Sequence, residues 1–226
     1  MIVWPCELDV STYAARGRDV TPPRPACPRC GGPTGPWSGY LRHLRDAGLH
    51  RIFVPRVRCR RCGRTDALPP WFVTPYRWDT TDVIGQALER SAAGEGVRRI
   101  AATIGRPETT VREWCRRFGA VATDLARVLL AAAVRIGWTG FELPVAPGPR
   151  AAAAVAALGA VWSRRHGPVG PWRLAVLVTG GAWLAPNTTS PLAPATASPV
   201  MARTSLDGGA PWPATRQKHS PSGAIT

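Results

Sequence analysis

Apolar residues recur at helical spacing between residues 79 and 118. Two runs share the i, i+3, i+4, i+7 pattern that places side chains on one face of a helix. They are Val97, Ile100, Ala101 and Ile104, followed by Val111, Trp114, Cys115 and Phe118. Gly105 separates the two runs and predicts a left-handed turn that ends the first of these helices. An earlier helix, with a candidate N-cap among residues 79–81 and an end near Ala93, completes a three-helix segment.

The preceding residues follow a strand pattern instead. Residues 50–57 are rich in branched and aromatic side chains, which predicts a β-strand. The residues before it leave room for a hairpin with a turn around residues 46–48. Three prolines in residues 68–78 exclude a helix there. We expect the aromatic rings of that segment to pack across the joint between the hairpin and the helices, with a platform for stacked nucleobases as the alternative.

Beyond residue 119 the pattern weakens. Residues 119–136 and 150–166 are alanine-rich and predict helices, whereas residues 171–184 fit either a short helix or a strand. A membrane hairpin is the alternative, but each apolar run is shorter than the roughly 18 residues of a spanning helix and carries arginine. Residues 186–226 consist largely of Pro, Ser, Thr, Ala and Gly, so we expect a disordered tail.

The charge of the chain is strongly positive. The 226 residues carry a formal net charge of +15, with a pI near 11.3, which favours a polyanionic partner. Every basic residue except Lys218 is arginine, as in a GC-rich genome. Codon preference explains arginine in place of lysine, but it does not explain why only 14 acids face 29 basic residues. The first 20 residues lack a secretory signal, so we expect a cytoplasmic, nucleoid-associated protein.

Four of the six cysteines form two Cys-x-x-Cys pairs. The pairs are Cys27 with Cys30 and Cys59 with Cys62, and a glycine follows each. Two such turns aim four sulfurs at one point and predict a single structural Zn²⁺. Neighbouring arginines favour the thiolate form and therefore metal binding. Disulfides or unrelated cysteines are the alternative, and His43 and His50 would be competing ligands in a site that the four sulfurs already fill.

Together these patterns predict a mainly α protein with a small β zinc ribbon. We expect the ribbon to be followed by a three-helix helix-turn-helix domain, alanine-rich helices and the disordered tail. The expected divisions are a lead and linker over 1–26, the zinc ribbon with its aromatic and proline joint over 27–78, the helix-turn-helix over 79–119, the alanine-rich region over 120–185 and the tail over 186–226.

The third helix of that segment would enter the major groove of double-stranded DNA. The residues expected nearest the base edges are Thr109, Thr110, Arg112, Glu113 and Arg116. Arg98, Arg99 and Arg117 are better placed for phosphates, which give affinity without sequence information. A plain three-helix bundle with a solvated basic face is the alternative interpretation.

Residues 27–118 resemble the zinc-ribbon plus helix-turn-helix proteins of actinobacteria, which are related to the N-terminal regions of bacterial transposases. The matching strings are the two cysteine pairs, the joint at residues 68–70 and the stretch from Val97 to Phe118. The resemblance implies a DNA-binding protein linked to mobile elements, with a transposase or recombinase as a candidate partner.

The carboxylates argue against catalysis. A metal-dependent DNA strand transferase needs several carboxylates that converge on two metal ions. Beyond residue 119 the chain offers only Asp124, Glu142 and Asp207. We therefore expect no enzyme and no membrane contact, but a non-catalytic, sequence-specific DNA-binding accessory or regulator of a transposable element. A transposase-derived enzyme and a protein-docking adaptor anchored on DNA are the alternatives.

Overall fold

A long antiparallel hairpin forms one side of the molecule. The computed structural model describes residues 1–135, 152–155, 157 and 170–184. Strands β1 (Thr34–Arg45) and β2 (Leu49–Cys59) pair over almost their whole length, and β3 (Thr65–Ala67) adds to the other edge of β2. The strand predicted over residues 50–57 and the turn around 46–48 are confirmed.

The N-terminal residues cover part of this sheet. Trp4 forms an isolated bridge with Pro70, and helix α1 (Val10–Arg16) follows, N-capped by the Asp9 carboxylate on the Thr12 N–H. The buried Tyr13 hydroxyl donates a hydrogen bond of 2.9 Å to the Phe53 carbonyl of β2. Sequence reasoning missed α1, because its seven residues are too few to show a clear helical period.

Three helices pack beside the hairpin. They are α2 (Thr81–Ala92), α3 (Val97–Ile104) and α4 (Glu108–Arg135). Thr80 is the N-cap of α2, and Gly105 ends α3 in the left-handed conformation with a φ of 65°. The predicted helices and turn of this segment are therefore confirmed, and the alanine-rich helix predicted from residue 119 is the continuation of α4.

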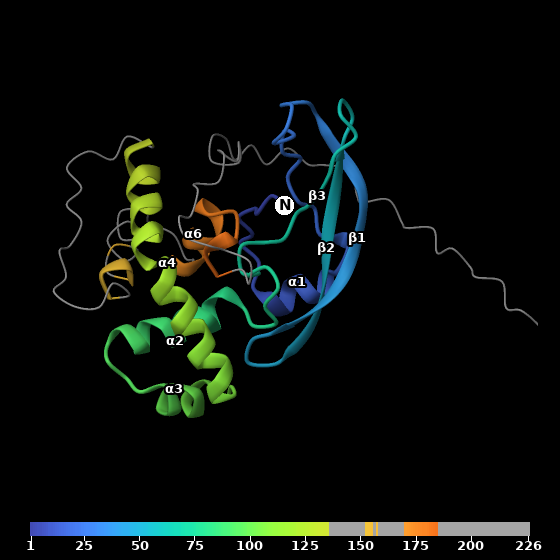
Figure 1. The fold of residues 1–226 in the computed structure, drawn as a ribbon. Coiled ribbons are helices and arrows are strands. Elements are labelled where there is room, and N and C mark those ends of the chain that lie inside the picture. Colours follow the sequence, from blue (N-terminus) through green and yellow to red (C-terminus); the bar gives the residue numbers. More distant parts are fainter. Residues whose placement is uncertain (136–151, 156, 158–169, 185–226) are drawn as a thin grey trace, which may run out of the picture.

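A C-terminal pair of short helices joins the core. Helix α6 (Pro171–Val178) and the 3-10 turn Ala182–Leu184 lie between α4 and the sheet in Figure 1. Trp172 packs its ring over Gly85 of α2, where a Cβ atom would lie 2.1 Å from the ring. Phe118 of α4 meets Trp172 edge-on at 5.5 Å between ring centroids, and Trp183 stacks on Trp172 at 5.2 Å.

The predicted fold class is wrong. The protein is a mixed α/β structure with a three-stranded sheet, and not a mainly α chain in which a zinc ribbon precedes a three-helix domain. One hydrophobic core runs from Ile2 through the sheet and the helices to Leu184. The physical reason is the length of β1 and β2, which carries them far beyond the cysteine turns and gives α1 an apolar sheet face to cover, while α2, α3, α4 and α6 pack on one another.

The remaining predictions about the C-terminal half are confirmed only in part. Residues 152–155 and 157 are helical, as predicted for residues 150–166, and residues 171–178 take the helical alternative. The predicted disordered tail over 186–226 lies outside the described residues. Among the helices of the described ranges, none combines the length and apolar composition needed to cross a membrane.

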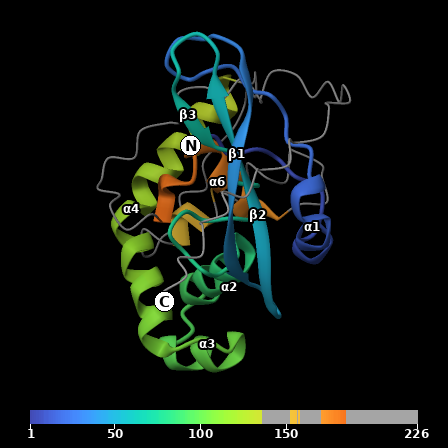
Figure 2. The ribbon, with the colours of Figure 1, turned by 90° about the vertical axis from the view of Figure 1, so that its right-hand side faces the viewer.

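Figure 2 shows that the hairpin runs from the cysteine turns to the helices. The cysteine turns lie at one end of the hairpin, where β1 begins and β2 ends. The β1–β2 turn at the other end lies close to the helices, next to the turn between α3 and α4. Because a strand rises about 3.3 Å per residue, the 11 residues of β2 separate these ends by roughly 35 Å.

Candidate functional site

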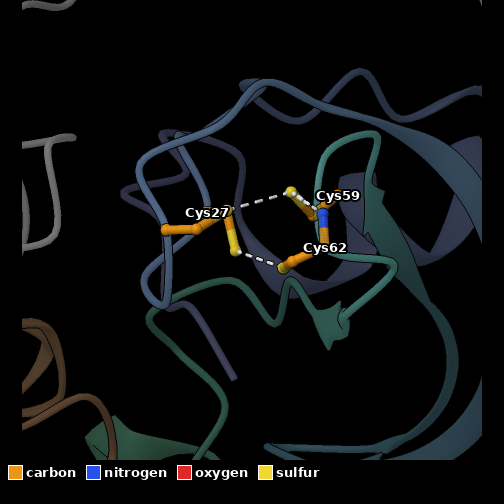
Figure 3. A group of neighbouring side chains, drawn as sticks. Cys27, Cys59 and Cys62 are labelled. Carbon is orange, nitrogen blue, oxygen red and sulfur yellow. Dashed lines mark hydrogen bonds between the residues drawn. The ribbon is translucent and has the colours of Figure 1, made fainter.

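The four paired cysteines converge on one point. The sulfur atoms of Cys27, Cys30, Cys59 and Cys62 all lie within 4.8 Å of one another. Cys27 Sγ lies 3.6 Å from Cys62 Sγ, and Cys30 Sγ lies 3.6 Å from Cys59 Sγ. Figure 3 shows the side chains of Cys27, Cys59 and Cys62 turned toward one another. These sulfur–sulfur distances exclude a disulfide, whose bond length is about 2.05 Å.

The distances fit a metal ion such as zinc. A tetrahedron with Zn–S bonds of about 2.3 Å has sulfur–sulfur edges of about 3.8 Å, close to the observed 3.6 Å. Two of the sulfurs belong to buried residues and two to half-buried ones, so the cluster is largely shielded from water. Four thiolates would leave no open position for a substrate, which is typical of a structural site.

The two cysteine turns have the same backbone hydrogen bonds, which explains why the sequence folds this way locally. In each turn the first cysteine donates its N–H to the carbonyl five residues later, Cys27 to Gly32 at 2.9 Å and Cys59 to Arg64 at 2.8 Å. In each turn the carbonyl of that cysteine accepts from a glycine N–H four residues later. These glycines, Gly31 and Gly63, have φ values of 67° and 71°. Such backbone angles favour glycine.

Backbone N–H groups stabilise the thiolate form of Cys59, which is the form that binds metals. The N–H groups of Cys62 and Arg61 point at Cys59 Sγ from 3.5 Å and 3.4 Å, and they lower the pKa of Cys59 to about 6. At Cys30 the Gly32 N–H also favours the thiolate. Desolvation and the three neighbouring thiols outweigh it and raise the pKa of Cys30 to about 11. Four sulfurs this close cannot all carry charge without a cation, so metal binding must release protons.

Gly32 is a further part of this site. A Cβ atom at Gly32 would lie 2.9 Å from Arg61 Cβ and 3.3 Å from Cys30 Sγ. The position therefore requires glycine because the two turns pack directly on each other. Sequence reasoning noted only that a glycine follows each cysteine pair, whereas the contact of Gly32 across the two turns is visible only in the structure.

The residues predicted to contact DNA lie around the turn between α3 and α4. The burial of α4 follows its predicted faces, with Val111, Trp114 and Phe118 at most 1% exposed. Arg98 and Arg99 of α3 are exposed, as are Thr109, Arg112 and Arg116 of α4, whereas Thr110, Glu113 and Arg117 are half-buried. The eight predicted residues therefore lie on α3 and at the start of α4, five of them exposed and three half-buried.

Most of these arginines pair with acids on the same surface. Arg112 pairs with Glu108, and Arg116 and Arg117 both pair with Glu113. The two arginines of Glu113 lower the pKa of that carboxyl. Arg98 lies 4.0 Å from Glu108, and Arg99 has no ion-pair partner among the described residues. The Arg112–Glu108 pair is open to solvent, and such pairs are worth about 0–1 kcal/mol, so a phosphate could replace Glu108.

Sequence reasoning missed the group that positions this surface. Asp79 is 2% exposed and pairs with Arg106 at 2.6 Å and with Arg45 at 2.9 Å. Arg106 belongs to the α3–α4 turn and also donates a hydrogen bond of 2.8 Å to the Asp46 carbonyl at the tip of the hairpin. The aspartate therefore connects α2, the α3–α4 turn and the hairpin. The sequence pattern did not reveal this role, because it indicated Asp79 only as one of three candidate N-caps of α2.

Of the three carboxylates beyond residue 119, the described part of the chain includes only Asp124, which does not belong to the candidate metal cluster found there. Asp124 is buried in α4 and pairs with Arg127 at 3.3 Å. Glu142 and Asp207 lie outside the described residues. His43 and His50 do not belong to the candidate metal cluster, which consists of the four cysteines. The expectation that the chain is not an enzyme stays a prediction.

A protein-family model described as a domain of unknown function (DUF6431) matches residues 27–114. The match begins at the first cysteine of the metal cluster and ends at Trp114 in α4, so it contains both cysteine turns and the α3–α4 turn. Comparisons with curated proteins and with solved structures give no match. None of these findings links the chain to transposases or to actinobacteria, so the resemblance seen in the sequence stays a prediction.

Proposed function

We propose that this is a DNA-binding protein in which one structural Zn²⁺ stabilises the far end of the hairpin. The carrying observation is the exposed surface formed by α3 and the start of α4, called the helix surface below. It presents five arginines against two acids. They are Arg98, Arg99, Arg112, Arg116 and Arg117, with Glu108 and Glu113. Its opposite face is buried, so the arginines are held on a rigid support.

The geometry supports double-stranded DNA as the partner. The start of an α-helix fits the major groove, and its first turns can reach base edges. Arg112 and Arg116 lie one and two turns into α4, where a guanidinium can bind guanine O6 and N7 together. Arg98 and Arg99 project from α3 and are suited to phosphates. Within this proposal the metal has no catalytic part, and it acts through the fold alone.

Salt dependence tests the charge-driven part of the proposal. Phosphate contacts by Arg98, Arg99 and Arg117 would make log K fall with log salt concentration with a slope of about −2.7. Fluorescence anisotropy of a labelled duplex over a series of salt concentrations measures this slope. We expect Arg99→Ala to reduce it by about one, whereas Arg24→Ala, which removes an exposed arginine before the first cysteine turn, leaves it unchanged. A slope near zero for the parent protein rejects the proposal.

Selection from a random duplex library tests the reading of sequence. Arg112→Ala should keep the melting temperature and relax the selected consensus, with a loss of about 1–3 kcal/mol at the preferred site. An unchanged consensus would show that Arg112 does not read bases. Incubation of the same duplexes with Mg²⁺ and Mn²⁺ tests the absence of catalysis, since strand nicking by the purified protein would contradict it.

A further inference from the structure

The outer face of the hairpin tip carries an exposed group of apolar, aromatic and basic side chains. We call it the tip patch, and it consists of Leu41, His43, Leu49, Arg51 and Trp78. His43 is directly opposite Arg51 in the β1–β2 register, and alternate residues of a strand share a face. Leu41 and Leu49, which are 43% and 62% exposed, therefore lie on the same face as this pair.

Trp78 adds an aromatic ring to this face. Its indole stacks on His43 with 5.9 Å between ring centroids and an angle of 26°, yet Trp78 remains 59% exposed. The same segment buries Trp71 and Phe72 to 6% and 0% exposure. Two aromatic rings of this segment therefore pack in the core, whereas Trp78 points to solvent. The left-handed backbone of Tyr76, with a φ of 60°, occurs where the chain leaves the core.

The tip patch lies beside the helix surface. Arg106, in the turn between α3 and α4, binds the Asp46 carbonyl at the hairpin tip and the Asp79 carboxylate, which follows Trp78 in the chain. The Arg45 N–H in turn bonds to the Trp78 carbonyl at 2.5 Å. These contacts hold the Trp78 segment and the hairpin tip against the turn that precedes α4.

Charge indicates what could cover this patch. Arg51 is exposed in this patch, whereas Arg45 pairs with Asp79. The single acid of residues 34–59 is Asp46, whose carboxylate accepts a hydrogen bond from the Ala47 N–H. A flat aromatic ring beside an exposed arginine binds the face of an unpaired base, while the guanidinium contacts the backbone of the same strand. In a closed duplex the base faces are stacked on one another, so the ring could not reach them.

We propose that the tip patch binds unpaired nucleotides of a DNA strand, with Trp78 as the stacking surface and Arg51 as a phosphate contact. This inference rests on the proposed function, because it places the unpaired strand next to a duplex held by the helix surface. The protein then binds the junction between duplex and single-stranded DNA more tightly than either part alone.

The experiment compares a blunt duplex with the same duplex carrying a single-stranded overhang that contains 2-aminopurine. We expect the overhang to increase affinity about 5- to 100-fold and to change the 2-aminopurine fluorescence through stacking. Trp78→Ala should abolish both effects and leave affinity for the blunt duplex unchanged. The matched control is Trp37→Ala, since Trp37 is 50% exposed but lies on β1 near the cysteine turns. Thermal melting of both variants checks that they fold.

The outcomes separate this proposal from the previous one. Equal affinity for blunt and overhanging duplexes, or an overhang preference that survives Trp78→Ala, overturns the stacking site. Binding of the free single strand through Trp78 without binding of the blunt duplex supports the stacking site and rejects the helix surface. Tighter binding of an RNA overhang of the same sequence overturns the assignment to DNA. If only Trp37→Ala removes the preference, the site lies elsewhere on the hairpin.

Discussion

The two ends of the hairpin are stabilised by different forces. At the cysteine end, two short turns with repeated hydrogen bonds hold four sulfurs together, and exposed arginines surround them. At the helix end, the buried Asp79 binds two arginines, while Trp114 and Phe118 pack in the apolar core. The first end offers four sulfurs that fit a metal ion, and a bound cation would neutralise their thiolates. The second end is complete with protein atoms alone, so the difference predicts separate responses to metal removal and to core substitutions.

Loss of the metal should have the largest effect. Cys59→Ser removes one ligand and should reduce the zinc content of the purified protein to near zero. Structural zinc in small peptides contributes about 10–16 kcal/mol, and in this protein the loss should fall on the cysteine turns. Elemental analysis and hydrogen exchange measure the two effects. We expect the amides of Gly31 and Gly63 to lose protection, while α4 keeps its protection.

Cys115→Ala is the matched control for this substitution. Cys115 lies on α4 beside the core and is not part of the sulfur cluster, so its removal should leave the metal content unchanged. Equal zinc content in Cys59→Ser and in the parent protein would refute the metal site. Simultaneous loss of protection in α4 would show that the two ends do not respond separately.

Truncation of the core should have the next largest effect. Trp114 is 1% exposed, and Trp114→Ala opens a cavity that should lower the free energy of unfolding by about 3–5 kcal/mol. Urea unfolding followed by circular dichroism measures this loss. Trp37→Ala, at a half-exposed tryptophan, should change stability far less. Zinc content should stay constant in both variants, and metal loss in Trp114→Ala would contradict the separation of the two ends.

Removal of the Asp79 charge should lower the free energy of unfolding by a somewhat smaller amount. Asp79→Asn leaves Arg106 and Arg45 without their carboxylate and should cost about 3 kcal/mol of stability. Because Arg106 also binds the hairpin tip, NMR chemical shifts of Asp46 and Gly105 should change as well. Glu108→Gln removes an exposed carboxylate nearby and should be neutral within about 0.5 kcal/mol. Equal stability of the two variants would show that Asp79 does not stabilise the contact between the α3–α4 turn and the hairpin.

The smallest expected effect concerns the contact between the two cysteine turns. Gly32→Ala places a methyl group 2.9 Å from Arg61 Cβ and should cost about 1–3 kcal/mol through overpacking. Competition with a zinc chelator should then remove the metal at a lower chelator concentration. Gly35→Ala is the control, because the nearest atom to its Cβ belongs to the Arg60 side chain at 3.5 Å. Identical chelator sensitivity of the two variants would contradict the tight packing at Gly32.

The sequence by itself determined the local features of this protein. Both cysteine turns, the N-cap region of α2, the end of α3 at Gly105 and the buried face of α4 were all predicted correctly. Each depends on residues at most a few positions apart, where hydrogen bonding and helical periodicity act directly.

Only the tertiary structure decided how these parts combine. The hairpin shares one hydrophobic core with the helices in a mixed α/β fold, and the predicted arrangement of a ribbon before separate helices was wrong. The contacts responsible join Asp79 with Arg106, Trp172 with Gly85 and Tyr13 with Phe53. These partners are far apart in sequence, and no spacing of residues predicts that they meet. Shape complementarity and desolvation in the folded chain determine which groups pair with a buried charge or ring. These pairs could therefore not be predicted from the sequence.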